Sequence, residues 1–165
     1  MARGRVGRSH EMNKTRIKTA ILEQLRNEFE VRHRVSKQTR SEGNNSESKA
    51  EGKYDTLSIE QNYLADGLAR QAHAAVLSAA EIETLPLIDF ATDDAINIGA
   101  LVRVEFSGFA PEWFFLCPSA GGTEVLVDEV AITVLTPESP LGSQLMEKRV
   151  GDRTANPSAR ILAVQ

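Results

Sequence analysis

Three carboxylates lie at regular spacing in a polar stretch between residues 44 and 56. Glu47, Glu51 and Asp55 follow one another at intervals of four residues. Carboxylate oxygens are ligands that Mg²⁺ prefers, and the ion usually takes one or two of them from a protein while water and phosphate fill its other positions. A Mg²⁺ ion held in this way can activate water for phosphodiester hydrolysis. The same spacing suits the solvated, acidic start of a helix, so the residues alone leave both interpretations open.

The other reactive residue types do not make a complete catalytic set. Cys117 is the only cysteine, and His10, His33 and His73 are scattered over the first half of the chain. A Cys-His or Ser-His-Asp nucleophile set is therefore unsupported, and no phosphate-binding glycine loop occurs. We expect the chain not to be an enzyme by itself and to have no cofactor of its own. Cys117 is expected to be a small core residue.

Charge is unevenly distributed along the 165 residues. Residues 1–40 hold 11 Lys and Arg against 4 Asp and Glu, a net charge of +7. Residues 41–97 hold 3 against 11, a net charge of −8, and residues 98–165 hold 5 against 8, a net charge of −3. A basic block beside an acidic block suggests an interaction with nucleic acid or with the machinery that acts on it.

The composition also bears on location. No apolar run reaches the roughly 18 residues of a membrane span. The basic residues 1–12 are not followed by the apolar segment of a secretory signal, and we predict them to be a disordered tail. We therefore expect no membrane partner. We also expect a cytoplasmic protein, because a single cysteine cannot form an intrachain disulfide and this agrees with a reducing compartment.

Two long helical patterns fill the first half. In residues 13–38, Ile17, Ile21, Leu25 and Phe29 recur every four residues with no Pro or Gly among them, which predicts an amphipathic helix. The stretch SEGNNS at 41–46 predicts the turn that ends it. From 54 to 83 a second helix is predicted, with a coiled-coil seam formed by Leu57, Gln61, Leu64, Leu68, Ala72, Ala75, Ala79 and Ile82.

Two such helices joined by a short connection are predicted to form an antiparallel hairpin over residues 13–84. The acidic stretch, near 41–55, then lies at the tip of this hairpin. Residues 85–97, which follow the helix and include Pro86, are predicted to be a linker.

The second half changes to a period of two residues. Ile98, Ala100, Val102, Val104 and Phe106 alternate with other residues, and strand-like runs follow at 111–118, 123–127, 130–137 and 159–165. The pair Gly121–Gly122 is predicted to be a hairpin turn. A short helix is predicted to begin near Pro140 and to end near Gly151. Residues 98–165 are therefore predicted to form a small domain with an antiparallel sheet and one helix, which makes the chain an α+β protein.

One stretch resembles a known family. The run ITVLTPESPLGSQLMEKRVGD is similar to the C-terminal domain of the bacterial Gre transcript-cleavage factors, where a strand leads into a Ser-Pro step and a short helix of the type S-P-x-x-x-x-L-x-x-K-x-V-G-D. The matching residues are Ser139, Pro140, Leu145, Lys148, Val150, Gly151 and Asp152. The resemblance is strongest at 130–152 and extends as a layout over roughly 13–165. It implies a helical hairpin followed by a domain of FKBP-like fold.

The resemblance implies a partner and a role for the acidic tip. Gre factors bind RNA polymerase at its secondary channel, and their hairpin enters the channel. Acidic tip residues then help to hold a catalytic Mg²⁺, so that the polymerase cleaves its own backtracked transcript. By this resemblance Glu47 and Glu51 are the catalytic tip residues. Glu47, Glu51 and Asp55 are the candidate ligands of a Mg²⁺ ion held jointly with the polymerase.

The resemblance also implies two further surfaces on a monomeric protein. The docking surface on the polymerase is expected at Ser139, Pro140, Leu141 and Gly142. Basic residues of the first helix approach the tip, where nascent RNA lies in such complexes: Arg32, Arg34, Lys37 and Arg40, preceded by Arg26. The alternative for these basic residues is a solubilising face of the coiled coil.

The tip departs from the family pattern by one residue. If Tyr54 occupies the family's tyrosine position, Glu47 takes the position of the first acid, but Ala50 stands where the second acid belongs and Glu51 follows one residue later. One residue is a rotation of about 100° in a helix. The alternative function is therefore a factor that occupies the channel without stimulating cleavage. A remote alternative, suggested by the FKBP-like fold alone, is a prolyl isomerase, but fold does not imply function.

Overall fold

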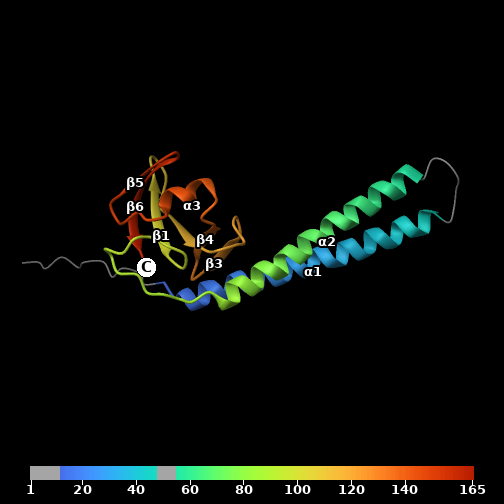
Figure 1. Cartoon of the computed structure of the whole chain (residues 1–165), viewed down its shortest axis with the longest axis horizontal. Coiled ribbons are helices and arrows are strands. Elements are labelled where there is room, and N and C mark those ends of the chain that lie inside the picture. Colours follow the sequence, from blue (N-terminus) through green and yellow to red (C-terminus); the bar gives the residue numbers. More distant parts are fainter. Residues whose placement is uncertain (1–11, 48–54) are drawn as a thin grey trace, which may run out of the picture.

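The computed structural model describes residues 12–47 and 55–165, and the side chains of residues 12–42 and 59–165. Two long helices form the arm that extends to the right in Figure 1, and a six-stranded sheet with one short helix follows them. The predicted α+β class is confirmed. Within the described ranges, no helix is long and apolar enough to cross a membrane. The elements in chain order are α1 (Lys14–Glu47), α2 (Asp55–Thr84), β1 (Leu101–Phe106), β2 (Glu112–Leu116), β3 (Glu124–Val127), β4 (Val130–Leu135), α3 (Pro140–Leu145), β5 (Arg153–Ala155) and β6 (Ser158–Val164).

The two long helices pack along a seam of small and apolar side chains. The seam was predicted to include Leu64, but Leu64 is 57% exposed and its neighbour Ala65 is fully buried instead. With Ala65 in the seam, the spacing from Gln61 to Ile82 alternates regularly between four and three residues, as a coiled coil requires. The small side chain also lets the helices approach closely. The buried seam residues are Ile17, Ile21, Leu25, Ser36, Ala65, Ala72, Ala75 and Ile82.

Helix α1 continues beyond its predicted end. It reaches Glu47, so the turn predicted at 41–46 is wrong. A glycine inside a helix, such as Gly43, costs about 1 kcal/mol relative to alanine. Contacts with α2 hold the helix just before this point. The Ser36 hydroxyl donates a hydrogen bond of 2.8 Å to the Ala65 carbonyl, and Arg40 forms an ion pair of 2.6 Å with Asp66. Tertiary packing therefore outweighs the local turn signal.

The strands lie in the order β3-β4-β2-β1-β6-β5. Every neighbouring pair is antiparallel except β2 and β4, which are parallel, so the sheet is mixed rather than wholly antiparallel. The reason is that β3 does not pair with β2: it forms a hairpin with β4 instead. The turn of that hairpin is Asp128–Glu129, whose φ angles of 50° and 65° are typical of a type I′ turn. A turn does form at Gly121–Gly122, but β2 and β3 on either side of it do not pair, so the hairpin predicted there is wrong.

The sheet has a buried layer on each face. One face packs against the base of the helical hairpin, and Trp113 and Phe115 lie on this side. The other face packs against α3 and the segment before β1, and Phe114 lies on that side because successive side chains of a strand point to opposite faces. The first layer brings together residues from both halves of the chain: Ile17, Ile21, Ile82, Leu85, Leu101, Phe115, Ile132 and Val134. A single core thus joins the hairpin to the sheet.

Candidate functional site

The predicted acidic tip falls largely outside the described part of the chain. Glu51 lies in the segment 48–54, which is not described. Glu47 is the last residue of α1 and Asp55 the first of α2, and their side chains are also outside the described set. Among the residues that are described, no cluster of three or more His, Cys, Asp or Glu side chains could hold a metal ion. The metal assignment to these three carboxylates therefore stays a prediction.

The four basic residues predicted near the tip differ in their surroundings. Arg32 forms an ion pair of 2.9 Å with Glu28 on its own helix, and Arg40 pairs with Asp66 on α2. Arg34 and Lys37 are exposed, and within the described ranges neither forms an ion pair. Two of the four charges are thus partly neutralised by the hairpin itself, whereas Arg34 and Lys37 are not.

Grooves between the helices contain side chains that the sequence analysis did not single out. One, of about 360 Å³, is lined by His33, Lys37, Arg40 and Ala69 among others. Phe29, one turn away, stacks on the His33 ring with centroids 5.3 Å apart. A spacing of four residues between an aromatic residue and a histidine on a helix is the signal that could have indicated this pair.

Two of the predicted docking residues have structural roles. The Ser139 hydroxyl caps α3: it accepts a hydrogen bond of 3.1 Å from the Gly142 amide and donates one of 2.7 Å to the Thr136 carbonyl. Gly142 is buried, and a Cβ atom at this position would lie 2.0 Å from the Thr136 oxygen. The sequence Ser-Pro-x-Gly is thus explained locally by a tight turn that enters a helix.

The other two predicted docking residues are more accessible. Pro140 is exposed at the first position of α3, where its fixed φ suits the helix start. Leu141 is partly buried against the core. Helix α3 ends at Leu145, earlier than the predicted end near Gly151, and Glu147 then takes a positive φ of 64°.

Gln144, which the sequence analysis missed, fixes α3 against the final hairpin. Its amide oxygen accepts hydrogen bonds of 2.8 Å and 2.9 Å from the amides of Ala155 and Asn156. Its nitrogen donates to the carbonyls of Pro140 and Asn156. The loop around Ser139 and the turn between β5 and β6 are therefore held as one surface.

A buried lysine holds the junction between hairpin and sheet. Lys14 is only 8% exposed, and its ammonium donates to the carbonyls of Ile88 and Gly99 at 2.5 Å and 2.9 Å. It also lies 4.7 Å from the centre of the Phe90 ring. Burial lowers the pKa of Lys14 to about 8, and the nearby charge of Asp89 opposes that shift in part. In the sequence, Lys14 was only one charge of a basic block.

The sole cysteine behaves as a core residue. Cys117 follows β2 and is fully buried in the layer between sheet and hairpin. Burial raises the pKa of the Cys117 thiol to about 12, although Lys18 lowers it slightly. A thiol that stays protonated is a poor nucleophile, which agrees with the core role predicted for it.

Comparison with known proteins gives only weak likenesses. No protein-family model matches the chain, and no curated protein sequence matches it. Among solved structures, GreA factor homolog 1 (Gfh1) of Thermus thermophilus is 18% identical, with 90% of this chain and 94% of that chain covered and a TM-score of 0.35. Gfh1 of Thermus aquaticus is 19% identical, with 89% and 95% covered and the same TM-score. A further structure of the transcription factor Gfh1 is 19% identical, with 88% and 94% covered and a TM-score of 0.34.

Proposed function

We propose that the chain is a Gre-like transcription factor that binds RNA polymerase and inserts its helical hairpin into the secondary channel. Two features of the chain support the proposal. The stretch from Ser139 to Asp152 carries the residue pattern of the Gre C-terminal domain. The order of elements, a long hairpin and then a sheet with one short helix, is the order that this resemblance implies.

The observation that carries the proposal is the shape of the hairpin. Helix α1 has 34 residues, which correspond to about 50 Å of helix. Its first turns are buried against the sheet, whereas the far part of both helices projects away from the sheet domain (Figure 1). A hairpin that only stabilised the domain would not need to extend so far. A projecting rod anchored at one end is suited to reach into a narrow channel of a larger partner.

We propose that the carboxylates at the end of this rod act in the active centre of the partner. Glu47 is the first candidate because it needs no gap in the comparison with the family pattern, and Glu51 is the second. Their oxygens supply the kind of ligand that Mg²⁺ takes from proteins. When bound, the ion would activate water for cleavage of the RNA phosphodiester. Arg34 and Lys37, which form no ion pair within the described part of the chain, would attract the phosphates of the transcript.

We propose that docking uses the exposed surface around α3. Ser139 and Gly142 shape the turn from within, so Pro140 is the residue to test for contact with the polymerase. A Pro140→Glu variant should keep the fold, because an acidic residue is tolerated at the first turn of a helix. It should co-purify less with core RNA polymerase. Undiminished co-purification would move the docking surface elsewhere.

The test of the whole proposal combines binding with transcript shortening in backtracked complexes. The purified chain should co-purify with bacterial core RNA polymerase and stimulate cleavage. Glu47→Ala and Glu51→Ala should lose the stimulation without losing binding. Glu60→Ala, which removes an exposed carboxylate of α2 outside the acidic stretch, is the matched control and should behave as wild type.

The possible results separate the candidate functions. Absence of binding to the polymerase would refute the proposal. Binding with cleavage that neither tip variant reduces would refute the tip assignment. Binding without stimulation by the wild-type chain would favour the factor that occupies the channel, for which the one-residue displacement of Glu51 is the supporting observation.

A further inference from the structure

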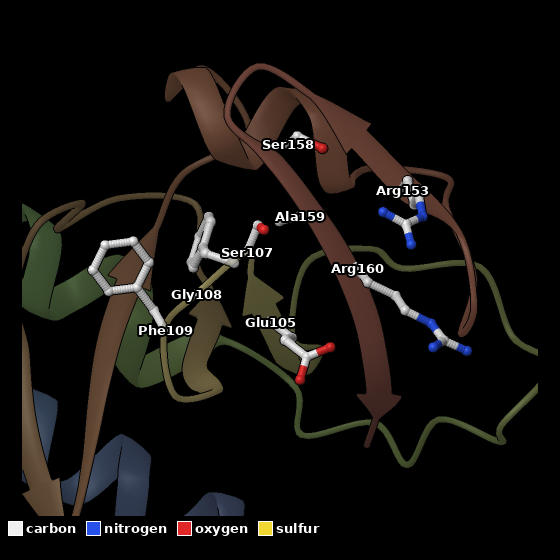
Figure 2. A pocket seen from close by; sticks show the side chains of 9 residues that line it. Glu105, Ser107, Gly108, Phe109, Arg153, Ser158, Ala159 and Arg160 are labelled. Carbon is white, nitrogen blue, oxygen red and sulfur yellow. The ribbon is translucent and has the colours of Figure 1, made fainter.

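An arginine pair lies in a hollow on the exposed part of the sheet, away from the hairpin. Arg153 on β5 and Arg160 on β6 are direct partners across the two strands, and Glu105 on β1 is the partner of Arg160 on its other side. Because partners on antiparallel strands share a face, the three side chains lie on the same side of the sheet. They line a cavity of about 290 Å³ together with Phe109 and neighbouring residues (Figure 2).

The two guanidinium groups lie opposite each other with one carboxylate, Glu105, beside them. All three charged residues are exposed, and across residues 12–47 and 55–165 neither Arg153 nor Arg160 forms a side-chain hydrogen bond or an ion pair. Like charges directly opposite each other on paired strands destabilise a sheet. By contrast Arg103, the next arginine on this face, lies 5.7 Å from the Trp113 ring and is held by it. Glu105 lies opposite Arg160 only, so one carboxylate faces two guanidinium groups and the pair keeps an excess of positive charge.

We infer that this hollow, named here the Arg153–Arg160 cavity, binds a short acidic segment of a partner protein. Guanidinium groups match carboxylates in a two-pronged geometry and are less tightly hydrated than ammonium groups. Two of them side by side can hold two carboxylates of one extended peptide. Phe109, 72% exposed, lies on the opposite side of the cavity from the arginines in the view of Figure 2 and offers an apolar surface for a neighbouring side chain of that peptide.

Charge favours a peptide over nucleic acid. Residues 98–165 have five basic and eight acidic residues, a net charge of −3, so a long polyanion is repelled by most of this domain. Glu105 inside the cavity repels phosphate and carboxylate alike. A peptide, in contrast, carries amide and side-chain donors beside its carboxylates, and Glu105 can accept from them. No residue of α3 or of the hairpin lines the cavity, and its test measures peptide binding alone, so this inference does not depend on the proposed function.

The test uses the full-length purified chain and fluorescence anisotropy with three labelled probes. The first is a twelve-residue peptide of Asp, Glu, Leu and Gln, the second is its counterpart with Asn and Gln in place of the acids, and the third is a twelve-nucleotide oligouridylate. The double variant Arg153→Glu with Arg160→Glu removes the pair. The variant Arg70→Glu, at an exposed arginine of α2, gives the same kind of charge change at another site.

We expect the acidic peptide to bind, the amide counterpart to bind at least about tenfold more weakly, and the double variant to lose about tenfold or more in affinity, as expected for loss of charge-assisted hydrogen bonds. Arg70→Glu should bind as wild type. A milder pair, Arg153→Gln with Arg160→Gln, should show the same loss and serves if the reversed charges impair folding. Tighter binding of the oligouridylate through the same arginines, peptide binding unaffected by either double variant, or no peptide binding at about 1 mM would each overturn the inference.

Discussion

Replacement of Gly142 by alanine tests whether the Ser-Pro-x-Gly turn has a structural role. The added Cβ atom would lie 2.0 Å from the Thr136 oxygen and 2.6 Å from the Ser139 hydroxyl, whereas ordinary contact begins at 3.4 Å. The backbone of one of the two segments must therefore move by about 1.4 Å, which is the difference between 3.4 and 2.0. Such a movement also stretches the bond that caps α3.

The expected cost lies at the upper end of the range for overpacked cores, about 3 kcal/mol of the free energy of unfolding. For a chain of this size, 1 kcal/mol shifts the melting temperature by about 2–4 °C, so a decrease of roughly 6–12 °C is expected. Thermal unfolding followed by circular dichroism measures it. Gly67→Ala is the matched control, because nothing lies within 4 Å of its added Cβ and the residue is inside α2. That variant should be more stable by about 0.5–1 kcal/mol.

Opposite signs for the two Gly→Ala changes are the required result. A Gly142→Ala protein that melts within about 2 °C of wild type, which is below about 1 kcal/mol, would refute the packing argument. The glycine would then have to be explained by contact with a partner instead.

The other predictions concern Lys14, Ser139 and Ile82. Because the pKa of Lys14 is about 8 in the folded chain and 10.5 as its ordinary value, the unfolded state binds more protons between these pH values, and Lys14 makes the free energy of unfolding rise with pH by up to about 3 kcal/mol. Cys117, with its pKa raised to about 12, opposes this rise above pH 9. Denaturant unfolding of wild type and Lys14→Met should therefore be compared from pH 7 to 9. Equal slopes of the free energy of unfolding against pH in the two proteins would contradict the assignment. Ser139→Ala removes the cap and should lower the free energy of unfolding by about 1–2 kcal/mol. Ser139→Thr keeps a capping hydroxyl and should retain most of that stability. An equal loss of melting temperature in both Ser139 variants would contradict the cap. Ile82→Ala should lower the free energy of unfolding by about 2–5 kcal/mol because Ile82 is fully buried between hairpin and sheet. Limited proteolysis of this variant should digest the hairpin and the sheet domain together. Survival of an intact sheet domain would show that the two parts fold separately.

Prediction from the sequence succeeded where a single local signal, the spacing of apolar residues, determines the structure. The two helices and the period-two strands follow from apolar spacing, and the opposite orientation of Phe114 and Phe115 follows from strand geometry. Prediction failed where long-range contacts decide. The helix passes Gly43 in spite of its turn signal, with Ser36 and Arg40 bound to α2 just before it. The turn at Asp128–Glu129 escaped notice because neither residue is glycine.

In the candidate site, too, local features could be predicted from the sequence and features that depend on long-range contacts could not. Residue types and spacing indicated the carboxylates at 47, 51 and 55 and the Ser139–Gly142 stretch. The roles of Ser139 and Gly142 as cap and close-packed turn depend on Thr136, whose carbonyl the fold brings against them. The Arg153–Arg160 cavity could not be foreseen, because the pairing of β5 with β6 and of β6 with β1 creates it.

The core shared by hairpin and sheet fixes the direction in which the hairpin projects from the sheet domain. Lys14 and Lys18 donate to carbonyls of the segment that leads from α2 to the sheet, and Ile17, Ile21 and Ile82 fill the joint. Because the arm is about 50 Å long, a rotation of the hairpin by 5° about the shared core displaces its far end by roughly 4 Å, more than the width of one carboxylate. The position of the far end is therefore determined by side-chain packing at the base of the hairpin. Enlarging or trimming a side chain in the joint would redirect the arm without altering any residue that it carries.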